Sequence, residues 1–165
     1  MEKNMLFDVK LNKQPYRIEI LDCIHPVPTV SYGFSRIKNK LKEEYKGLQG
    51  RELGKLRKSG CVITQEIVEP FFTYICDTSI EVFNANKNIL KYKNIIIECT
   101  FLYEEHKERA DNTQHICWVD LEPYIKNNSD IQFILIHFSL QYKDDEITEF
   151  INEQQKKYPN LKGMI

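Results

Sequence analysis

Apolar and polar residues alternate over residues 7–11 with the period of two that is typical of a half-buried β-strand. The alternation is interrupted by the turn-forming residues 12–15 and resumes over residues 16–20. Two alternating runs joined by a short polar segment predict a β-hairpin at the start of the chain.

Three further strand-like segments follow the hairpin, over residues 30–34, 62–68 and 71–75. Gly33 lies inside the first of them, which suggests that another part of the chain approaches its backbone closely. Pro70 separates the other two, because proline interrupts the hydrogen-bonding ladder of a strand. Between them, a helix is expected over about residues 51–58, ended by Gly60.

The second part of the chain alternates short apolar strands with amphipathic helices. Strands are expected over residues 95–97 and 131–136, and helices over residues 79–85, 104–111, 118–126 and 144–157. Alternation of this kind predicts one α/β unit, a mixed sheet covered by helices. We expect its inner face to be lined by Ile95, Ile97, Phe133 and Leu135, and to need more cover than this chain provides.

Composition describes a globular chain of 165 residues, with 42% hydrophobic and 28% charged residues and a formal net charge of -1. The chain as a whole is not basic, which excludes a strongly basic nucleic-acid-binding protein. No apolar run is long enough to span a bilayer. The five cysteines contain no C-x-x-C pair, so neither a disulfide framework nor a zinc finger is expected. Without a signal-peptide pattern at the start, free thiols predict an intracellular protein with no membrane partner.

Positive charge is concentrated over residues 36–58, which hold nine basic and three acidic residues. Lys and Arg gain affinity for phosphates by displacing counterions, so this segment is a candidate nucleic-acid contact. A solvated, partly helical surface explains the same composition without any ligand.

Polar side chains stand where three predicted strands end. His25, Asp77 and His137 each follow an apolar strand, the usual place for ligands in α/β proteins. Two imidazoles and a carboxylate suit zinc. A structural histidine and a helix-capping Asp77 remain the alternative explanation.

Glu98 also ends a strand, and His115 follows the helix after it. A carboxylate that is hydrogen-bonded to an imidazole raises its basicity and suits general acid catalysis, although the sequence separation alone favours two unrelated residues. His106 is expected to be a solvated helix residue, and Trp118 to belong to the core.

These segments resemble, in order, motifs of ribonuclease Z, the tRNA 3′-processing endonuclease of the metallo-β-lactamase superfamily. His25-Pro-Val-Pro-Thr-Val-Ser-Tyr-Gly-Phe resembles its histidine-to-Gly-Tyr segment, and Cys76-Asp77-Thr78 its Gly-Asp-Thr strand end. Glu98-Cys99-Thr100-Phe101 is similar to its Glu-Ala/Ser-Thr-Phe segment, and Gln114-His115 to its Gly-His. His137-Phe138-Ser139-Leu140-Gln141-Tyr142 resembles its His-Phe-Ser-x-Arg-Tyr.

The resemblance implies a role for each matched residue. His25 and His137 would each bind one zinc ion, Asp77 would bridge two, and Glu98 with His115 would help to protonate the leaving group. The basic segment, residues 36–60, would be a substrate-contacting insertion that binds a tRNA precursor through Lys55, Arg57 and Lys58.

The chain departs from the family in three respects. The H-x-H-x-D-H motif is absent, Cys76 replaces a glycine beside Asp77, and Gln141 replaces an arginine that would contact phosphate. We therefore expect the second half only of a metallo-β-lactamase αβ/βα sandwich, a single domain over residues 1–165. Such a half would be inactive and zinc-poor alone, and would associate with a complementary N-terminal half or with itself. A non-catalytic relic, or an RNA- or protein-interaction module, is the alternative.

Overall fold

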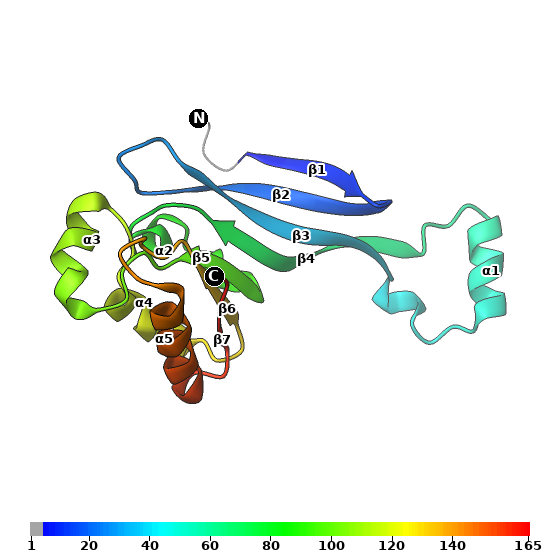
Figure 1. Ribbon diagram of the computed structural model, residues 1–165. Helices are drawn as coiled ribbons and strands as arrows, with labels where there is room; N and C mark the ends of the chain where they lie inside the picture. The colour runs from blue at the N-terminus through cyan, green and yellow to red at the C-terminus, as the bar shows by residue number, and fades with distance from the viewer. Residues whose placement is uncertain (1–4) are drawn as a thin grey trace.

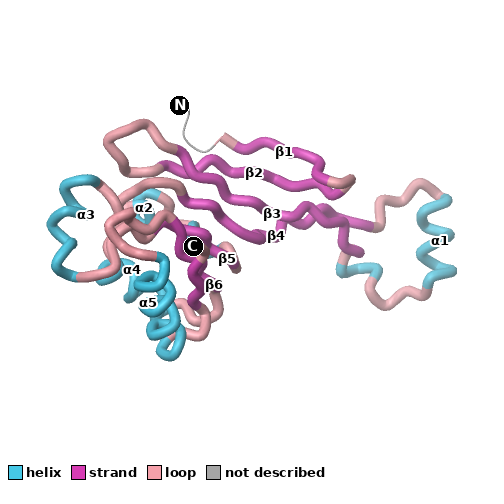
Figure 2. Tube along the Cα trace, viewed as in Figure 1, coloured by secondary structure: helices cyan, strands magenta, loops and turns pink. Residues whose placement is uncertain are grey.

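The computed structural model describes residues 5–165 and contains one seven-stranded sheet (Figures 1 and 2). The spatial order of the strands follows the sequence, with antiparallel pairing from β1 to β4 and parallel pairing from β4 to β7. The strands are β1 (Leu6–Leu11), β2 (Gln14–Asp22), β3 (Val30–Leu41), β4 (Thr64–Ile75), β5 (Asn94–Glu98), β6 (Gln132–Ile136) and β7 (Leu161–Gly163).

One helix lies between β3 and β4, and the others connect the strands from β4 to β7, as the alternating pattern predicts. They are α1 (Gly50–Lys58), α2 (Val82–Ala85), α3 (Lys107–Thr113), α4 (Trp118–Asn127) and α5 (Asp144–Lys157), with 3-10 turns over Glu43–Tyr45, Ile89–Lys91 and Glu104–His106. The expected mixed sheet covered by helices is therefore confirmed.

The predicted hairpin is also confirmed, and its turn has a clear physical basis. Asn12 and Lys13 both adopt positive φ, 48° and 67°, between β1 and β2. Two consecutive left-handed residues make the kind of tight turn whose twist matches that of the flanking strands.

The expectation that Pro70 divides two strands is wrong. β4 runs without a break through Pro70, which lies opposite Ser35 of β3. The register of the β3–β4 pair shifts between Phe34, which pairs with Phe72, and Ser35, which pairs with Pro70, so Phe71 is an extra residue and the bulge lies in β4 beside the proline. Bulges of this type accommodate proline in a sheet.

The outer parts of β3 and β4 form a two-stranded arm that projects from the sheet and carries α1 at its end (Figure 1). β3 pairs with β2 only as far as Arg36, so its last residues pair with β4 alone. A backbone hydrogen bond of 3.0 Å from Lys42 to Ile63 closes the ladder at the base of the loop that bears α1. The sequence predicted the helix but only the inner part of β3.

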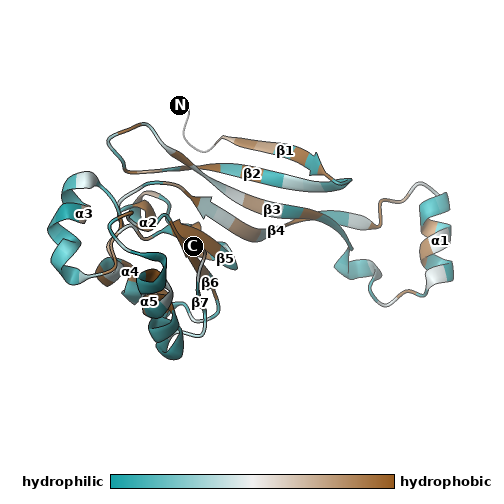
Figure 3. Ribbon diagram, in the orientation of Figure 1, coloured by the Kyte–Doolittle hydropathy of each residue, from teal (hydrophilic) through white to brown (hydrophobic). Residues whose placement is uncertain are grey.

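The two faces of the sheet differ, and the prediction about the under-covered face is wrong. Ile95, Ile97, Phe133 and Leu135 are fully buried in the core formed with α2, α4 and α5. The ribbon of β5, which lies beside these helices, is coloured as hydrophobic in Figure 3. Side chains alternate along a strand, so the residues between them point to the other face. On that face lie residues that are paired across β2 to β6: Ile20, Tyr32, Tyr74, Ile96 and Ile134. Tyr74 is exposed and the other four are partly buried.

Two expectations from composition can be compared with the structure. All five cysteines are free, as expected. Over residues 5–165, the helices are too short or too polar to cross a lipid bilayer.

Gly33 is tightly packed, as its position in a strand suggested. A Cβ atom added there would lie 2.0 Å from the hydroxyl oxygen of Tyr92, whose side chain is fully buried and donates a 2.8 Å hydrogen bond to Glu19. We expect Gly33→Ala to lower the free energy of unfolding by about 3 kcal/mol, because a buried ring must move. Gly54→Ala, with no atom within 4 Å of the added carbon, should not lower it. Denaturant unfolding measures both changes, and equal stability of the two variants would contradict this packing.

Candidate active site

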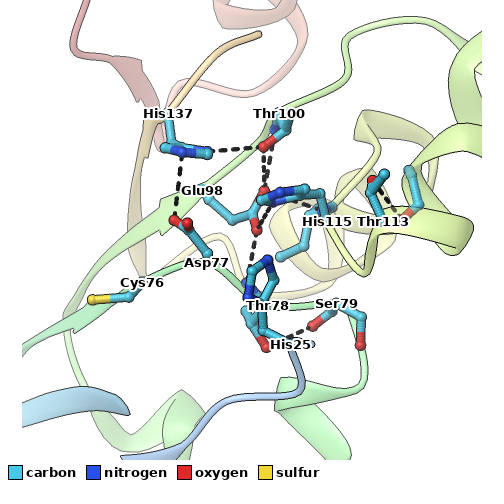
Figure 4. Close-up of polar contacts among 12 residues, drawn as sticks. His25, Cys76, Asp77, Thr78, Ser79, Glu98, Thr100, Thr113, His115 and His137 are labelled. Atoms are coloured by element: carbon cyan, nitrogen blue, oxygen red, sulfur yellow. Dashed lines mark hydrogen bonds and ion pairs between the residues drawn. The ribbon is translucent and has the colours of Figure 1, made fainter. Parts of the chain in front are cut away.

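Segments that follow β2, β4, β5 and β6 meet at one edge of the sheet and bring the polar residues together (Figure 4). His25 follows β2, Asp77 follows β4, Glu98 ends β5 and His137 follows β6. His115, from the segment after α3, completes the group. The ring centroid of His115 lies 5.0 Å from that of His25 and 5.4 Å from that of His137.

Glu98 is the buried centre of this group. Its carboxylate is fully inaccessible and accepts five hydrogen bonds. Oε1 accepts from the Thr78 backbone N–H at 2.7 Å and from His115 Nδ1 at 2.8 Å. Oε2 accepts from the hydroxyl and backbone N–H of Thr100, at 2.6 and 3.3 Å, and from the Ile116 backbone N–H at 3.1 Å. Three of these partners are backbone N–H groups, which can only donate, so the surroundings of Glu98 suit a carboxylate that accepts from every side.

Backbone conformation places His115 against Glu98. Gln114, the residue after α3, adopts the left-handed conformation with φ of 55° and ends the helix. Helices commonly end in this way, most often on glycine. The reversal turns the chain so that Ile116 bonds to Phe101 and His115 reaches the carboxylate.

The hydrogen bonds fix which nitrogen of each imidazole carries a proton. Because Glu98 only accepts, His115 donates from Nδ1, and the Thr100 hydroxyl uses its single proton on Glu98. Thr100 must then accept from His137 Nδ1, which lies 3.0 Å away. The Nδ1 atoms of His115 and His137 are therefore both used in these hydrogen bonds, and Nε2 is the ring nitrogen that each histidine can offer to another group.

His137 lies at a strained position and points its ring towards Asp77. Its φ is 59°, in the left-handed region that residues other than glycine seldom adopt. His137 Nε2 is 3.5 Å from Asp77 Oδ1, which is longer than a good hydrogen bond. In the neutral tautomer these are two acceptors facing each other, an arrangement that a proton or a metal ion between them would satisfy.

The donor atoms of His137 and Asp77 fit a shared metal ion. Two ligands of a tetrahedral zinc, each about 2.0–2.2 Å from it, are about 3.4 Å apart. The observed separation of 3.5 Å is close to this value, and both side chains are accessible, at 46% and 40%. His25 lies beside His115, with 5.0 Å between the ring centroids, and is a further candidate ligand next to this pair (Figure 4).

A second set of donor atoms lies within 4.8 Å of one another, on Glu98, His115 and His137. Glu98 does not suit a metal, because its five hydrogen bonds already occupy the roughly four lone-pair positions of a carboxylate. Asp77 and His137 are thus the better pair of candidate ligands, and the roles that the resemblance implies for them and for His25 stay a prediction.

Cys76 does not add a ligand beside Asp77. Its sulfur points away from the Asp77 carboxylate and from His137 (Figure 4). Burial, and to a smaller extent the charge of Asp77, raise the pKa of the Cys76 thiol, which keeps it protonated. The substitution of glycine by Cys76 therefore leaves the space between Asp77 and His137 open.

Sequence reasoning missed the roles of Thr78 and Thr100. Thr78 is fully buried; its backbone N–H bonds Glu98 and its hydroxyl accepts from the Ile24 N–H at 2.8 Å, beside His25. Thr100 links Glu98 to His137. Both threonines stand in the quoted motifs, and their position one or two residues from a carboxylate at a strand end was the available signal.

The prediction for Trp118 is confirmed, whereas the prediction for His106 is wrong. Trp118 is 5% exposed and belongs to the core, as expected. His106 is not simply solvated: its ring is packed against Tyr142, whose hydroxyl lies 2.7 Å from His106 Nδ1.

The candidate RNA-binding residues Lys55, Arg57 and Lys58 are all exposed on α1. Helix α1 lies at the end of the arm, on the opposite side of the molecule from α3 and the loop between β2 and β3, the elements that border the candidate site (Figure 1). Over residues 5–165, none of the three forms an ion pair, so their charges are available to an external anion.

The chain is similar in sequence to two plant tRNases Z. The chain is 30% identical over 139 residues to the chloroplastic tRNase Z TRZ2 of Arabidopsis thaliana, covering 81% of this chain and 38% of that protein. It is 29% identical over 156 residues to tRNase Z TRZ1 of the same plant, covering 93% of this chain and 55% of the relative. The chain therefore spans about half the length of these relatives or less. No protein-family model matches it.

The fold has a solved counterpart. The crystal structure of the metallo-β-lactamase fold protein YhfI from Bacillus subtilis aligns with 96% of this chain and 48% of its own, with a TM-score of 0.50 and 12% identity. At that identity the likeness concerns the fold alone, and it confirms the expected metallo-β-lactamase fold.

The hydrogen bond to Glu98 raises the pKa of His115 above its usual value near 6.5, although burial opposes the shift. A raised folded-state pKa stabilises the protein fully below pH 6.5, and this contribution is lost as the pH rises through the folded value. We expect Glu98→Gln to lower the His115 pKa and to lower the free energy of unfolding by about 3 kcal/mol. The difference in unfolding free energy between the native chain and the variant should become smaller from pH 6 to pH 9.

NMR titration of the histidine ring protons, with denaturant unfolding at each pH, measures both effects. Glu104→Gln, at an exposed glutamate, is the control and should change neither. A native His115 pKa at or below 6.5 would contradict this assignment.

Proposed function

We propose that this tRNase Z-like chain of the metallo-β-lactamase fold supplies one half of a zinc-dependent endonuclease that processes the 3′ ends of tRNA precursors. The observation that supports this most directly is the position of five polar residues at one sheet edge. They are the residues that the sequence matched to the family in order: His25, Asp77, Glu98, His115 and His137.

In this proposal His115 donates a proton to the oxygen that leaves the phosphodiester. Glu98 holds His115 with Nε2 directed away from the carboxylate, and it keeps the imidazole protonated at higher pH than a free histidine. Because Glu98 is fully buried, it acts on the substrate only through His115. Its role is to position and charge the imidazole.

Asp77 and His137 would bind a zinc ion together, and His25 would contribute a ligand on the other side of the site. Bound zinc lowers the pKa of a water molecule and stabilises developing charge on phosphate oxygens. Thr100 prepares His137 for this role by holding its Nδ1 proton, which leaves Nε2 as the free ligand atom. Structural zinc needs about four protein ligands and catalytic zinc about three, so this chain alone is short of ligands for two ions.

The arm would hold the RNA at a distance from the reacting bond. Of its basic residues, Lys38 and Lys46 pair with Glu69 and Glu43, and Arg36 stacks on Phe71. The cations of α1 have no such partners within the described part of the chain. Phosphates of a bound tRNA precursor are the complementary ligand.

A non-catalytic RNA- or protein-interaction module is the second candidate. It is favoured by the absence of an H-x-H-x-D-H segment from the 165 residues. The two functions differ in what happens when that segment is supplied by another polypeptide.

We expect the chain alone to bind zinc weakly and substoichiometrically, and to cleave neither a tRNA precursor nor bis(p-nitrophenyl) phosphate. Adding a polypeptide that carries the H-x-H-x-D-H half of a tRNase Z should give two tightly bound zinc ions and activity, because the missing ligands are then present. Elemental analysis and a cleavage assay, with and without that polypeptide, make the measurement.

Single substitutions assign the effect to the proposed ligands. Asp77→Ala or His137→Ala should abolish tight zinc binding in the assembly, whereas His106→Ala should not. Two tight zinc ions in the lone chain, or full activity after Asp77→Ala, would refute the ligand assignment. An assembly that stays inactive would favour the interaction module.

Charge reversal on α1 tests whether the arm binds RNA. The triple variant Lys55→Glu, Arg57→Glu and Lys58→Glu should weaken tRNA binding at low salt and reduce the slope of log affinity against log salt by about 2 to 3. A control with the same charge change, on the exposed Lys126, Lys156 and Lys157, should bind nearly as the native chain does. Equal tRNA binding by both triple variants in gel-shift titrations would show that α1 is a solvated surface that does not contact RNA.

A further inference from the structure

Between His137 and Tyr142, the loop that follows β6 carries no lysine or arginine. It continues through Ser139 and Gln141 to Tyr142, and the exposed side chain of Gln141 is a neutral amide. The Gln141 Oε1 atom accepts a 2.9 Å hydrogen bond from the guanidinium of Arg109, which comes from α3. A positive charge from another element is thus held at this loop.

Arg109 is fixed in place but not neutralised. Its guanidinium carbon lies 5.4 Å from the ring centroid of Phe101, which is 3% exposed. Over residues 5–165 it forms no ion pair, whereas Lys107, on the same helix, pairs with both Asp111 and Asp120. A guanidinium has five N–H donors, and one bond to Gln141 leaves most of them available.

The segment beneath Arg109 is part of the candidate active site. Phe101 follows Thr100, which bonds Glu98 and His137. Backbone bonds join Phe101 to Ile116 and Thr100 to Ser139, at 3.2 and 3.0 Å. Arg109 therefore rests on the strand end that separates the His115 and His137 loops.

We propose that Arg109 binds a phosphate of the RNA substrate next to the bond that is cleaved, with Gln141 orienting its guanidinium. The planar guanidinium fork matches two phosphate oxygens, and an arginine already held by an amide and an aromatic ring loses little freedom on binding. This inference rests on the proposed function, because it takes the substrate to be a phosphodiester of RNA.

The test compares variants in binding and in cleavage. Arg109→Gln should weaken tRNA binding about tenfold at low salt and lower the salt slope by about 1. The double variant Arg109→Gln with Gln141→Arg should recover most of the affinity, since it returns a guanidinium to the same position. Arg17→Gln, at an arginine paired with Asp8 and Glu66, is the control and should bind as the native chain does.

Two readouts separate this inference from the proposed function. Cleavage by the assembly with the H-x-H-x-D-H half tests the function, while the salt-dependent affinity of the Arg109 variants tests the inference. Native affinity and slope in Arg109→Gln would overturn the role of Arg109 even if the assembly cleaves. Weakened binding that Gln141→Arg restores would support it even if no cleavage is observed.

Discussion

The burial of one ionised carboxylate constrains the whole candidate site. Removing a charge from water is costly unless hydrogen bonds replace its hydration. Glu98 obtains five of them from segments after β4, β5 and α3. The requirement fixes those segments relative to one another, and with them the orientation of His115 and, through Thr100, of His137.

Much of this arrangement could be predicted from the sequence, and the exceptions have physical causes. His25, Asp77 and His137 each follow an apolar strand, and the structure gathers them at one sheet edge because the ends of these strands meet there. The contact between Glu98 and His115 depends on the left-handed Gln114, which no local pattern signals in a residue other than glycine. The resemblance to a known family therefore indicated this pair when spacing did not.

The choice of sheet face shows where pattern reasoning fails. Strands β5 and β6 are continuously apolar, so the sequence alone does not say which alternate residues face the helices. In the structure Ile95 and Phe133 are buried beneath helices, and Ile96 and Ile134 remain partly accessible on the opposite face. An apolar face of this kind is typical of a surface that packs against another sheet or protein.

Under the proposed function, one complement would serve both the sheet and the site. The chain aligns with 48% of its structural counterpart, one sheet face is partly open, and two zinc ions would need more ligands than the candidates found here. We infer that one complementary polypeptide, bearing the H-x-H-x-D-H segment, covers that face and completes the site. Its sheet would pack on the side of Tyr74, Ile96 and Ile134.

Sedimentation velocity of this chain, mixed with the H-x-H-x-D-H half of a tRNase Z, tests that claim most directly. We predict a one-to-one complex that Ile96→Asp on the open face prevents, and that Val62→Asp, at an exposed position on the arm, leaves intact. A folded monomer that stays unassociated on dilution and ignores the added half would contradict the account.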